Sequence, residues 1–199
     1  MQGDLFQTQA NLPLEKAEVS YWPQWLSQPD PLFCELVGAF NWQQRSLSIY
    51  GRTCLTPRLV AWCADDGVNY TYSGDTAPRQ AWPIALLRLR RQLEVFCQVP
   101  FNGVLANYYR DGDDSMGWHS DDERSLGPRP CIASISLGAP RDFAFRPLNG
   151  GKQRHNICLD HGSLLIMQGE TQKHWQHALP RRRRVNQPRL NLTFRHIID

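Results

Sequence analysis

From residue 101 to the C-terminus the sequence is divided into short apolar segments separated by Gly, Pro and Asp clusters. Many short strands at such spacing are typical of a sandwich or a jelly roll. We therefore expect a mainly β fold (α+β), with helices packed outside a jelly-roll core. The candidate strands are FNGVLANYY, CIASISLG, DFAFR, HNICLD, SLLIMQ and RLNLTFRHI.

Two helices are expected in the first half of the chain. The segment DPLFCELVGAF offers Asp30 as N-cap and Pro31 at the first helical position. A longer helix begins at Pro83 and ends before Pro100, and its arginines lie off the apolar stripe. That stripe contains Leu86, Leu89, Leu93 and Phe96. Between the helices, SLSIYGRTCLTPRLVAW and VNYTYSG alternate around glycine as short strands and hairpins do.

The length of 199 residues suits one domain, and residues 1–28 carry little periodicity, so we expect an irregular N-terminal arm there. No apolar run is long enough to span a membrane, and the N-terminus has no leader pattern, which predicts a soluble, cytoplasmic protein. The six cysteines form no Cys-x-x-Cys pair and are expected to be reduced core thiols.

The net charge of +3 is modest but concentrated in two arginine runs. Arg181–Arg184 form one run, and Arg88, Arg90 and Arg91 form the other. A clustered positive surface suits a polyanion such as nucleic acid, although a short run is equally compatible with a merely solvated face.

The segment MGWHSDDER contains a candidate metal-ligand pair. In a strand, residues two apart project from one face, so His119 and Asp121 can bind one ion. Two histidines and a carboxylate on one face are the usual ligands of non-haem Fe(II). The third ligand is then a distant histidine, and we favour His177 because it lies between two apolar strands. The candidates are His155, His161, His174, His177 and His196.

The last strand, PRLNLTFRHI, has two different faces. Period-two alternation puts three apolar residues on the core side and Arg189, Asn191, Thr193 and Arg195 on the other. Arginines on an inward face are unfavourable unless each meets an anion. A small dicarboxylate along this strand would satisfy both, and the alternative is that each pairs with a nearby Asp or Glu.

Three separated motifs, in order, resemble the AlkB family of Fe(II)- and 2-oxoglutarate-dependent dioxygenases, especially its DNA-repair members. They are NYYRDGDDSMGWHSDDERSLGPRPCIASISLGAPRDFAFR, LDHGSLLIMQGETQKHWQHALP and PRLNLTFR. The resemblance runs from about residue 45 to the C-terminus. It implies a double-stranded β-helix (jelly-roll) core and a single dioxygenase domain over residues 29–199, in which residues 45–100 form nucleotide-recognition hairpins and an outer helix.

The resemblance also implies roles for particular residues. The iron ligands are His119, Asp121 and His177. The residues around 2-oxoglutarate are Asn107, Tyr109, Arg189, Asn191, Thr193 and Arg195, with Arg189 and Tyr109 on the distal carboxylate and Arg195 nearer the metal. The nucleotide-binding residues are Tyr50, Gly51, Arg52, Tyr70, Thr71, Tyr72 and Asp122, among which Asp122 meets the exocyclic amine of the damaged base.

The expected function is oxidative demethylation of N-alkylated bases such as 1-methyladenine and 3-methylcytosine in DNA. The cofactors are Fe(II), 2-oxoglutarate and O2, and 2-oxoglutarate is decarboxylated to succinate. A methylated base must leave the stack to reach a buried metal, which aromatic side chains and phosphate-binding arginines would support. We expect a monomer that acts on nucleic acid and not at a membrane. RNA as substrate, a catalytically silent nucleic-acid-binding module and a structural zinc site are the alternatives.

Overall fold

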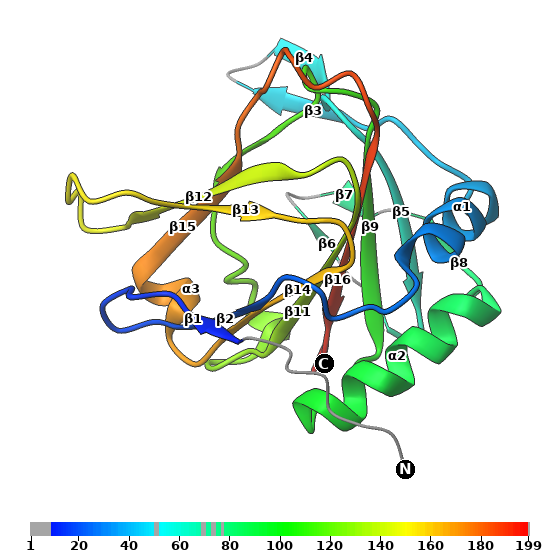
Figure 1. Ribbon diagram of the computed structural model, residues 1–199, viewed down its shortest axis with the longest axis horizontal. Coiled ribbons are helices and arrows are strands. Elements are labelled where there is room, and N and C mark those ends of the chain that lie inside the picture. Colours follow the sequence, from blue (N-terminus) through cyan, green and yellow to red (C-terminus); the bar gives the residue numbers. More distant parts are fainter. Residues whose placement is uncertain (1–8, 50–51, 69–70, 73–74, 77, 199) are drawn as a thin grey trace.

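A computed structural model describes residues 9–49, 52–68, 71–72, 75–76 and 78–198, and two facing β-sheets dominate it (Figure 1). The large sheet has the order β1 (Ala10–Asn11), β2 (Glu18–Trp22), β14 (Ser163–Gln168), β11 (Ile132–Gly138), β16 (Arg189–Arg195), β9 (Gly103–Tyr109), β5 (Leu59–Ala64) and β8 (Arg79–Gln80). The small sheet has the order β10 (Met116–His119), β15 (Trp175–Leu179), β12 (Arg141–Pro147) and β13 (His155–Leu159).

The other elements lie around these sheets. Two small hairpins pair β3 (Ser46–Ile49) with β4 (Arg52–Leu55) and β6 (Thr71–Tyr72) with β7 (Asp75–Thr76). The helices are α1 (Pro29–Ala39), α2 (Ile84–Cys97), the short α3 (Thr171–His174) and the 3-10 turn η1 (Arg124–Leu126). Within the described residues, no helix is long and apolar enough to cross a membrane. The expectation of a mainly β fold with flanking helices and a jelly-roll core is confirmed.

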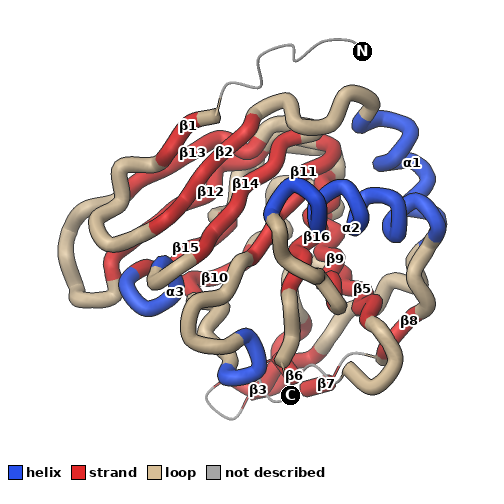
Figure 2. The backbone as a smooth tube through the Cα atoms, turned by 90° about the horizontal axis from the view of Figure 1, so that it is seen from below, coloured by secondary structure: helices blue, strands red, loops and turns tan. Residues whose placement is uncertain are grey.

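Two apolar layers explain why the sheets and helices stack in this order. In Figure 2, α1 and α2 lie together on the side of the large sheet that faces away from the small sheet. Leu190, Leu192 and Phe194 of β16 are fully buried in the layer that these helices cover, which also holds Leu36 and Leu89. A second apolar cluster contains residues of both sheets, so it joins the sheets over part of their facing surfaces. The alternate residues of β16 therefore face the space between the sheets.

The helix limits differ slightly from those expected. α1 begins at Pro29, one residue before Asp30, and Gln28 is its N-cap. α2 runs from Ile84 to Cys97, directly after Pro83, and ends at Gln98 in a left-handed conformation. Its buried residues include the expected Leu86, Leu89 and Leu93. Phe96 is 41% exposed and packs edge-on against Trp22 and Trp25.

The irregular arm predicted for residues 1–28 is wrong for residues 10–11 and 18–22. Glu18–Trp22 pairs antiparallel with Gln168–Leu164 and extends the large sheet. Val19 and Tyr21 are buried while Glu18 is exposed, so this segment has a period-two pattern, but only five residues carry it. Its strand conformation depends on the hydrogen bonds that β14 offers, which are remote in sequence.

The expected recognition region, residues 45–100, also needs a correction. Leu59–Ala64 pairs along its whole length with β9 and is part of the large sheet, not of a recognition hairpin. Its near-continuous burial explains why alternation alone did not distinguish it from the hairpins that precede and follow it. The described hairpins β3–β4 and β6–β7 remain the candidate recognition elements.

Candidate metal centre and anion site

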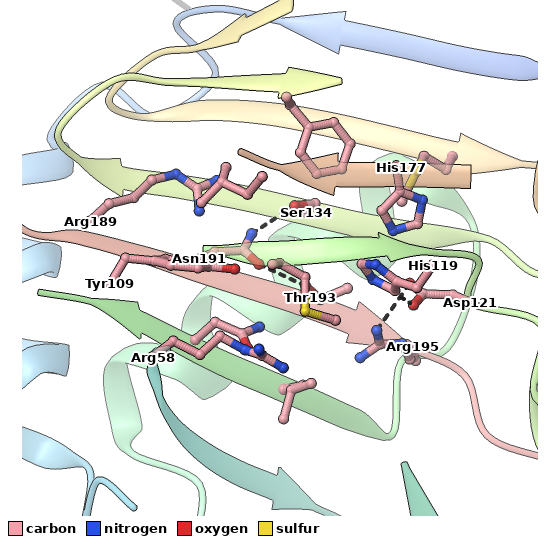
Figure 3. A pocket seen from close by; sticks show the side chains of 16 residues that line it. Arg58, Tyr109, His119, Asp121, Ser134, His177, Arg189, Asn191, Thr193 and Arg195 are labelled. Carbon is pink, nitrogen blue, oxygen red and sulfur yellow. Dashed lines mark hydrogen bonds and ion pairs between the residues drawn. The ribbon is translucent and has the colours of Figure 1, made fainter. Parts of the chain in front are cut away.

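Three side chains from the predicted ligand set meet between the sheets (Figure 3). His119 ends β10 and is the cross-strand partner of His177 in β15, so both rings project from the same face. Asp121 lies two residues beyond His119, and its Oδ1 is 3.7 Å from His119 Nε2. One ligand atom from each residue lies within 4.8 Å of the others, so one cation can contact all three.

The charges of this group suit a divalent cation. Burial raises the pKa of Asp121, but the cationic guanidinium of Arg195 and the nearby imidazoles of His177 and His119 outweigh it and hold this pKa at about 2, so the carboxylate is ionised. Burial is also the main reason that the pKa of His177 falls to about 3, which leaves a neutral imidazole with a free lone pair. Metal ligands must be deprotonated, and both residues already are at neutral pH.

The orientation of each ligand is also favourable. The carboxylate of Asp121 accepts a hydrogen bond from Arg195 Nη2 at Oδ2, over 3.0 Å, whereas its buried Oδ1 has no hydrogen-bond partner among the described residues. His119 Nδ1 lies 2.9 Å from the Gly117 carbonyl oxygen, which only a protonated Nδ1 can contact favourably, so Nε2 carries the lone pair. The orphaned carboxylate oxygen and the two imidazole lone pairs fit a metal ion.

The three side chains line one end of a cavity between the sheets that is partly open to solvent. The other end is formed where β9 ends and β16 begins, at Tyr109 and Arg189 (Figure 3). The four polar residues of β16 all line this cavity, as the alternation predicted. Asn107 and Tyr109 line it from β9, the neighbouring strand, because they face the same side as their cross-strand partners Asn191 and Arg189.

Arg189 is a buried cation with no carboxylate partner in the described part of the chain. Its side chain is 2% exposed, and within the described residues no carboxylate oxygen lies within ion-pair distance of its guanidinium. Nη2 donates to Ser136 Oγ over 2.9 Å, and the guanidinium carbon lies 5.3 Å from the centre of the Tyr109 ring. Burial lowers the pKa of Arg189 to about 10. A cation held in this way favours an anionic ligand in the cavity.

The two arginines of β16 therefore differ. Arg195 pairs with Asp121, so the alternative that an acidic residue neutralises the arginine holds at that end of the strand. It does not hold for Arg189, about one strand length away. Between them, Asn191 Nδ2 donates to Ser134 Oγ over 2.8 Å, and Thr193 Oγ1 donates to Asn191 Oδ1 over 3.0 Å. The cavity thus offers a cation at one end and metal ligands at the other.

Some lining residues were not anticipated from the sequence. Arg58 is 4% exposed, lines the cavity and donates from Nε to Asn107 Oδ1 over 2.8 Å. Its position just before a buried strand was a weak signal, because only the pairing of β5 with β9 brings it beside Asn107. Ser134, Phe143 and Met116 also line the cavity. The Phe143 ring stacks on His177 with centroids 5.2 Å apart, which restricts the imidazole.

The residues predicted to bind the nucleotide do not line this cavity in the described part of the chain. Asp122 is exposed and lines an adjacent open depression with Asp121 and Glu123, not the cavity that Arg189 lines. Arg52 lies in β4, and Thr71 and Tyr72 form β6. The remaining predicted nucleotide-binding residues, Tyr50, Gly51 and Tyr70, lie outside the described part of the chain.

The other candidate histidines do not belong to the group of metal-ligating side chains, and the arginines of residues 181–184 differ in their contacts. His155, His161, His174 and His196 are absent from the one group of three possible metal-ligating side chains found among the described residues. His161, for example, accepts from the Gly138 amide and contacts Asp30 instead. In the run 181–184, Arg182 pairs with Asp142, and Arg183, whose side chain is 84% exposed, has its Nε 3.9 Å from Asp113 Oδ1.

Comparisons with known proteins agree with this geometry. A family model described as the 2OG-Fe(II) oxygenase superfamily matches residues 18–195. The chain is 43% identical over 181 residues to alpha-ketoglutarate-dependent dioxygenase alkB homolog 3 of Bos taurus, an alignment that covers 86% of this chain and 63% of that protein. It is 43% identical over 183 residues to DNA oxidative demethylase ALKBH2 of Mus musculus, covering 86% of this chain and 76% of that protein.

A solved structure extends the comparison to the fold. The structure titled "The structure of OsALKBH1" superposes with a TM-score of 0.60 and 17% sequence identity, covering 94% of this chain and 100% of the other. At that identity it supports the arrangement of strands and not the substrate. The chain spans 63% of the length of the alkB homolog 3 relatives from Bos taurus, Mus musculus and Homo sapiens.

Proposed function

Because this chain belongs to the 2OG-Fe(II) oxygenase superfamily and, within it, to the AlkB family, we propose that it demethylates N-alkylated bases in DNA by oxidation. The observation that carries the proposal is one cavity with two ends. At one end lie the ligand atoms of His119, Asp121 and His177, and at the other lies the buried cation Arg189, which pairs with no carboxylate among the described residues. A dicarboxylic keto acid next to a metal ion has the charges that this cavity requires.

In this proposal His119, Asp121 and His177 hold Fe(II), which supplies O2 activation coupled to the decarboxylation of 2-oxoglutarate to succinate. Arg189 and Tyr109 bind the distal carboxylate, because the guanidinium fork matches a carboxylate and lies beside the phenol ring. Arg195 holds the Asp121 carboxylate through Oδ2, and Oδ1, which has no hydrogen-bond partner among the described residues, would be the ligand atom. Phe143 and Leu105 give the cavity an apolar wall beside the reacting groups.

The proposed substrate is a flipped base such as 1-methyladenine or 3-methylcytosine. Two groups of relatives carry the names DNA oxidative demethylase ALKBH2 and alkB homolog 3, at 40–44% identity in the mammalian proteins. Asp122 lies next to a metal ligand and is exposed, so it can accept a hydrogen bond from an exocyclic amine or attract a positively charged base. The exposed arginines of residues 181–184 would contact phosphates, which position an enzyme without reading sequence.

The test is mass spectrometry of a methylated oligonucleotide after incubation with iron, 2-oxoglutarate and ascorbate. We expect the loss of one methyl group and an equal amount of succinate. His119→Ala should abolish both, because a metal ligand is removed, while oligonucleotide binding stays within about threefold, because the phosphate contacts are elsewhere. A His119→Ala variant that demethylates at the native rate would exclude the proposed ligand set.

Substrates of different strand type separate the alternatives. Single-stranded DNA, duplex DNA and RNA carrying the same lesion are compared at equal concentration. Faster demethylation of RNA would replace the DNA proposal with an RNA demethylase. Tight oligonucleotide binding, with succinate release at background in the presence of iron, would favour the silent binding module.

A further inference from the structure

A buried glutamine outside the ligand set contacts the backbone of the metal-ligating aspartate. Gln172 lies in α3 and is 4% exposed. The backbone N–H of Asp121 donates to Gln172 Oε1 over 2.9 Å. The other end of the same amide, Nε2, contacts Met167 Sδ at 3.6 Å. The orientation of the glutamine amide is thereby fixed, with its oxygen toward Asp121.

Asp121 needs such a contact because it lies beyond the end of a strand. β10 ends at His119, and residues 120–123 have no regular secondary structure. Whereas β10 pairs with β15 at His119, no strand pairing extends to Asp121. A buried backbone N–H without a partner costs about 1–3 kcal/mol. Gln172 therefore takes the place of the strand partner that Asp121 lacks.

The turn that carries Gln172 is itself attached to the large sheet. Thr171 Oγ1 accepts from the Glu18 backbone N–H over 2.9 Å and donates to the Gln168 carbonyl over 2.6 Å. α3 continues directly into β15, which carries His177. One short segment therefore carries one ligand and fixes the backbone of another.

We propose that Gln172 is a positioning residue of the metal centre, which acts through the Asp121 backbone and contributes no ligand atom of its own. The inference rests on the proposed function, since it concerns the same metal site. Arg195 fixes the Asp121 carboxylate from one side, and Gln172 fixes its main chain from the other. Together they determine where Oδ1 points.

The experiment titrates the full chain with Co(II) and follows the visible absorption bands, which report both affinity and ligand geometry. Gln172→Met keeps the side-chain volume and removes the acceptor. Gln172→Glu keeps an acceptor oxygen in either protonation state, and its ionised form has no donor for Met167. Thr171→Val is the matched control, because it is equally buried, lies in the same turn and loses hydrogen bonds that do not involve Asp121.

We expect Gln172→Met to weaken Co(II) binding at least about tenfold, the size of effect typical of residues that orient ligands, and to shift the visible bands. Gln172→Glu and Thr171→Val should keep the native bands and bind within about threefold of the native affinity. Thermal unfolding of the metal-free proteins separates lost stability from lost positioning. If Gln172→Met does not fold, Gln172→Glu still tests the inference, because weak Co(II) binding by the folded Gln172→Glu variant would contradict the acceptor role of residue 172.

Three results would overturn the inference: native binding and bands in Gln172→Met, weak binding in Gln172→Glu, or equally weak binding in Thr171→Val. The first shows that the contact is dispensable, and the last shows that the turn acts only as a structural support. Failure of the proposed function is distinguishable, because a different substrate would leave the Co(II) titration of the native chain and its variants as expected. Failure of the metal site itself would mean that the native chain binds no Co(II) there. In that case His119→Ala would leave the titration unchanged.

Discussion

Replacing Arg189 by methionine should stabilise the ligand-free protein and weaken 2-oxoglutarate binding. The pKa of Arg189 is about 10, against an ordinary 12.5, because burial disfavours the charged form. At about 1.4 kcal/mol per pKa unit, this corresponds to roughly 3 kcal/mol against folding. Neutral pH lies well below both values, so the group is charged in the folded and the unfolded chain and the full penalty is present.

The substitution also removes the hydrogen bond to Ser136, which stabilises the fold by about 1 kcal/mol. The free energy of unfolding of the ligand-free protein then increases by about 2 kcal/mol, which raises the melting temperature by roughly 4–8 °C in a domain of this size. The same guanidinium would form charge-assisted hydrogen bonds to the ligand carboxylate. Losing about 3 kcal/mol of these hydrogen bonds to the carboxylate weakens 2-oxoglutarate binding on the order of 100-fold.

Circular dichroism on the metal-free proteins measures the melting temperature, and calorimetric titration of 2-oxoglutarate with Mn(II) present measures the affinity. Arg141→Met is the control, because Arg141 is equally buried but donates to the carbonyl oxygens of Asp111, Asp114 and Pro180. Its loss should lower the melting temperature. An Arg189→Met protein that melts below the native protein and binds 2-oxoglutarate with native affinity would refute the reasoning.

Three further predictions concern other parts of the molecule. Leu192→Ala should lower the free energy of unfolding by about 3 kcal/mol in urea titrations and leave the 2-oxoglutarate affinity within about threefold, because Leu192 is fully buried on the face of β16 opposite the cavity. Burial raises the pKa of Tyr21 to about 12, so the neutral phenol's contribution to the free energy of unfolding is complete below pH 10 and is lost as the pH rises toward 12. Over this range the free energy of unfolding of the native protein should fall by about 3 kcal/mol more than that of Tyr21→Phe. An equal pH dependence of the two proteins would contradict the raised pKa. Replacing Arg183 and Arg184 by alanine should reduce the slope of log K against log salt for DNA binding by about 2, and an unchanged slope would show that these exposed side chains contact no phosphate.

The strand pattern shows how far a local sequence can predict this fold. The period-two alternation of RLNLTFR predicted that its apolar residues lie on the core side of the strand and its polar residues on the other face. In the structure the first face lies in the apolar layer that the helices cover, and the second face lines the cavity. The spacing of His119 and Asp121 predicted a shared strand face, but β10 ends at His119, so Asp121 reaches the site from the segment that follows the strand. Alternation is a property of one strand, so it needs no knowledge of the partner strands.

Tertiary structure decided everything that depends on which strands meet. The cross-strand register of β10 and β15 places His177, rather than another histidine, opposite His119. The pairing of β5 with β9 brings Arg58 beside Asn107, and the pairing of β14 with β2 converts part of the supposed irregular arm into a strand. Gln172 reaches Asp121 only because α3 folds against the end of β10. The strands of each pair lie far apart in the chain, so the local sequence predicts the faces of single strands but not which strands become neighbours.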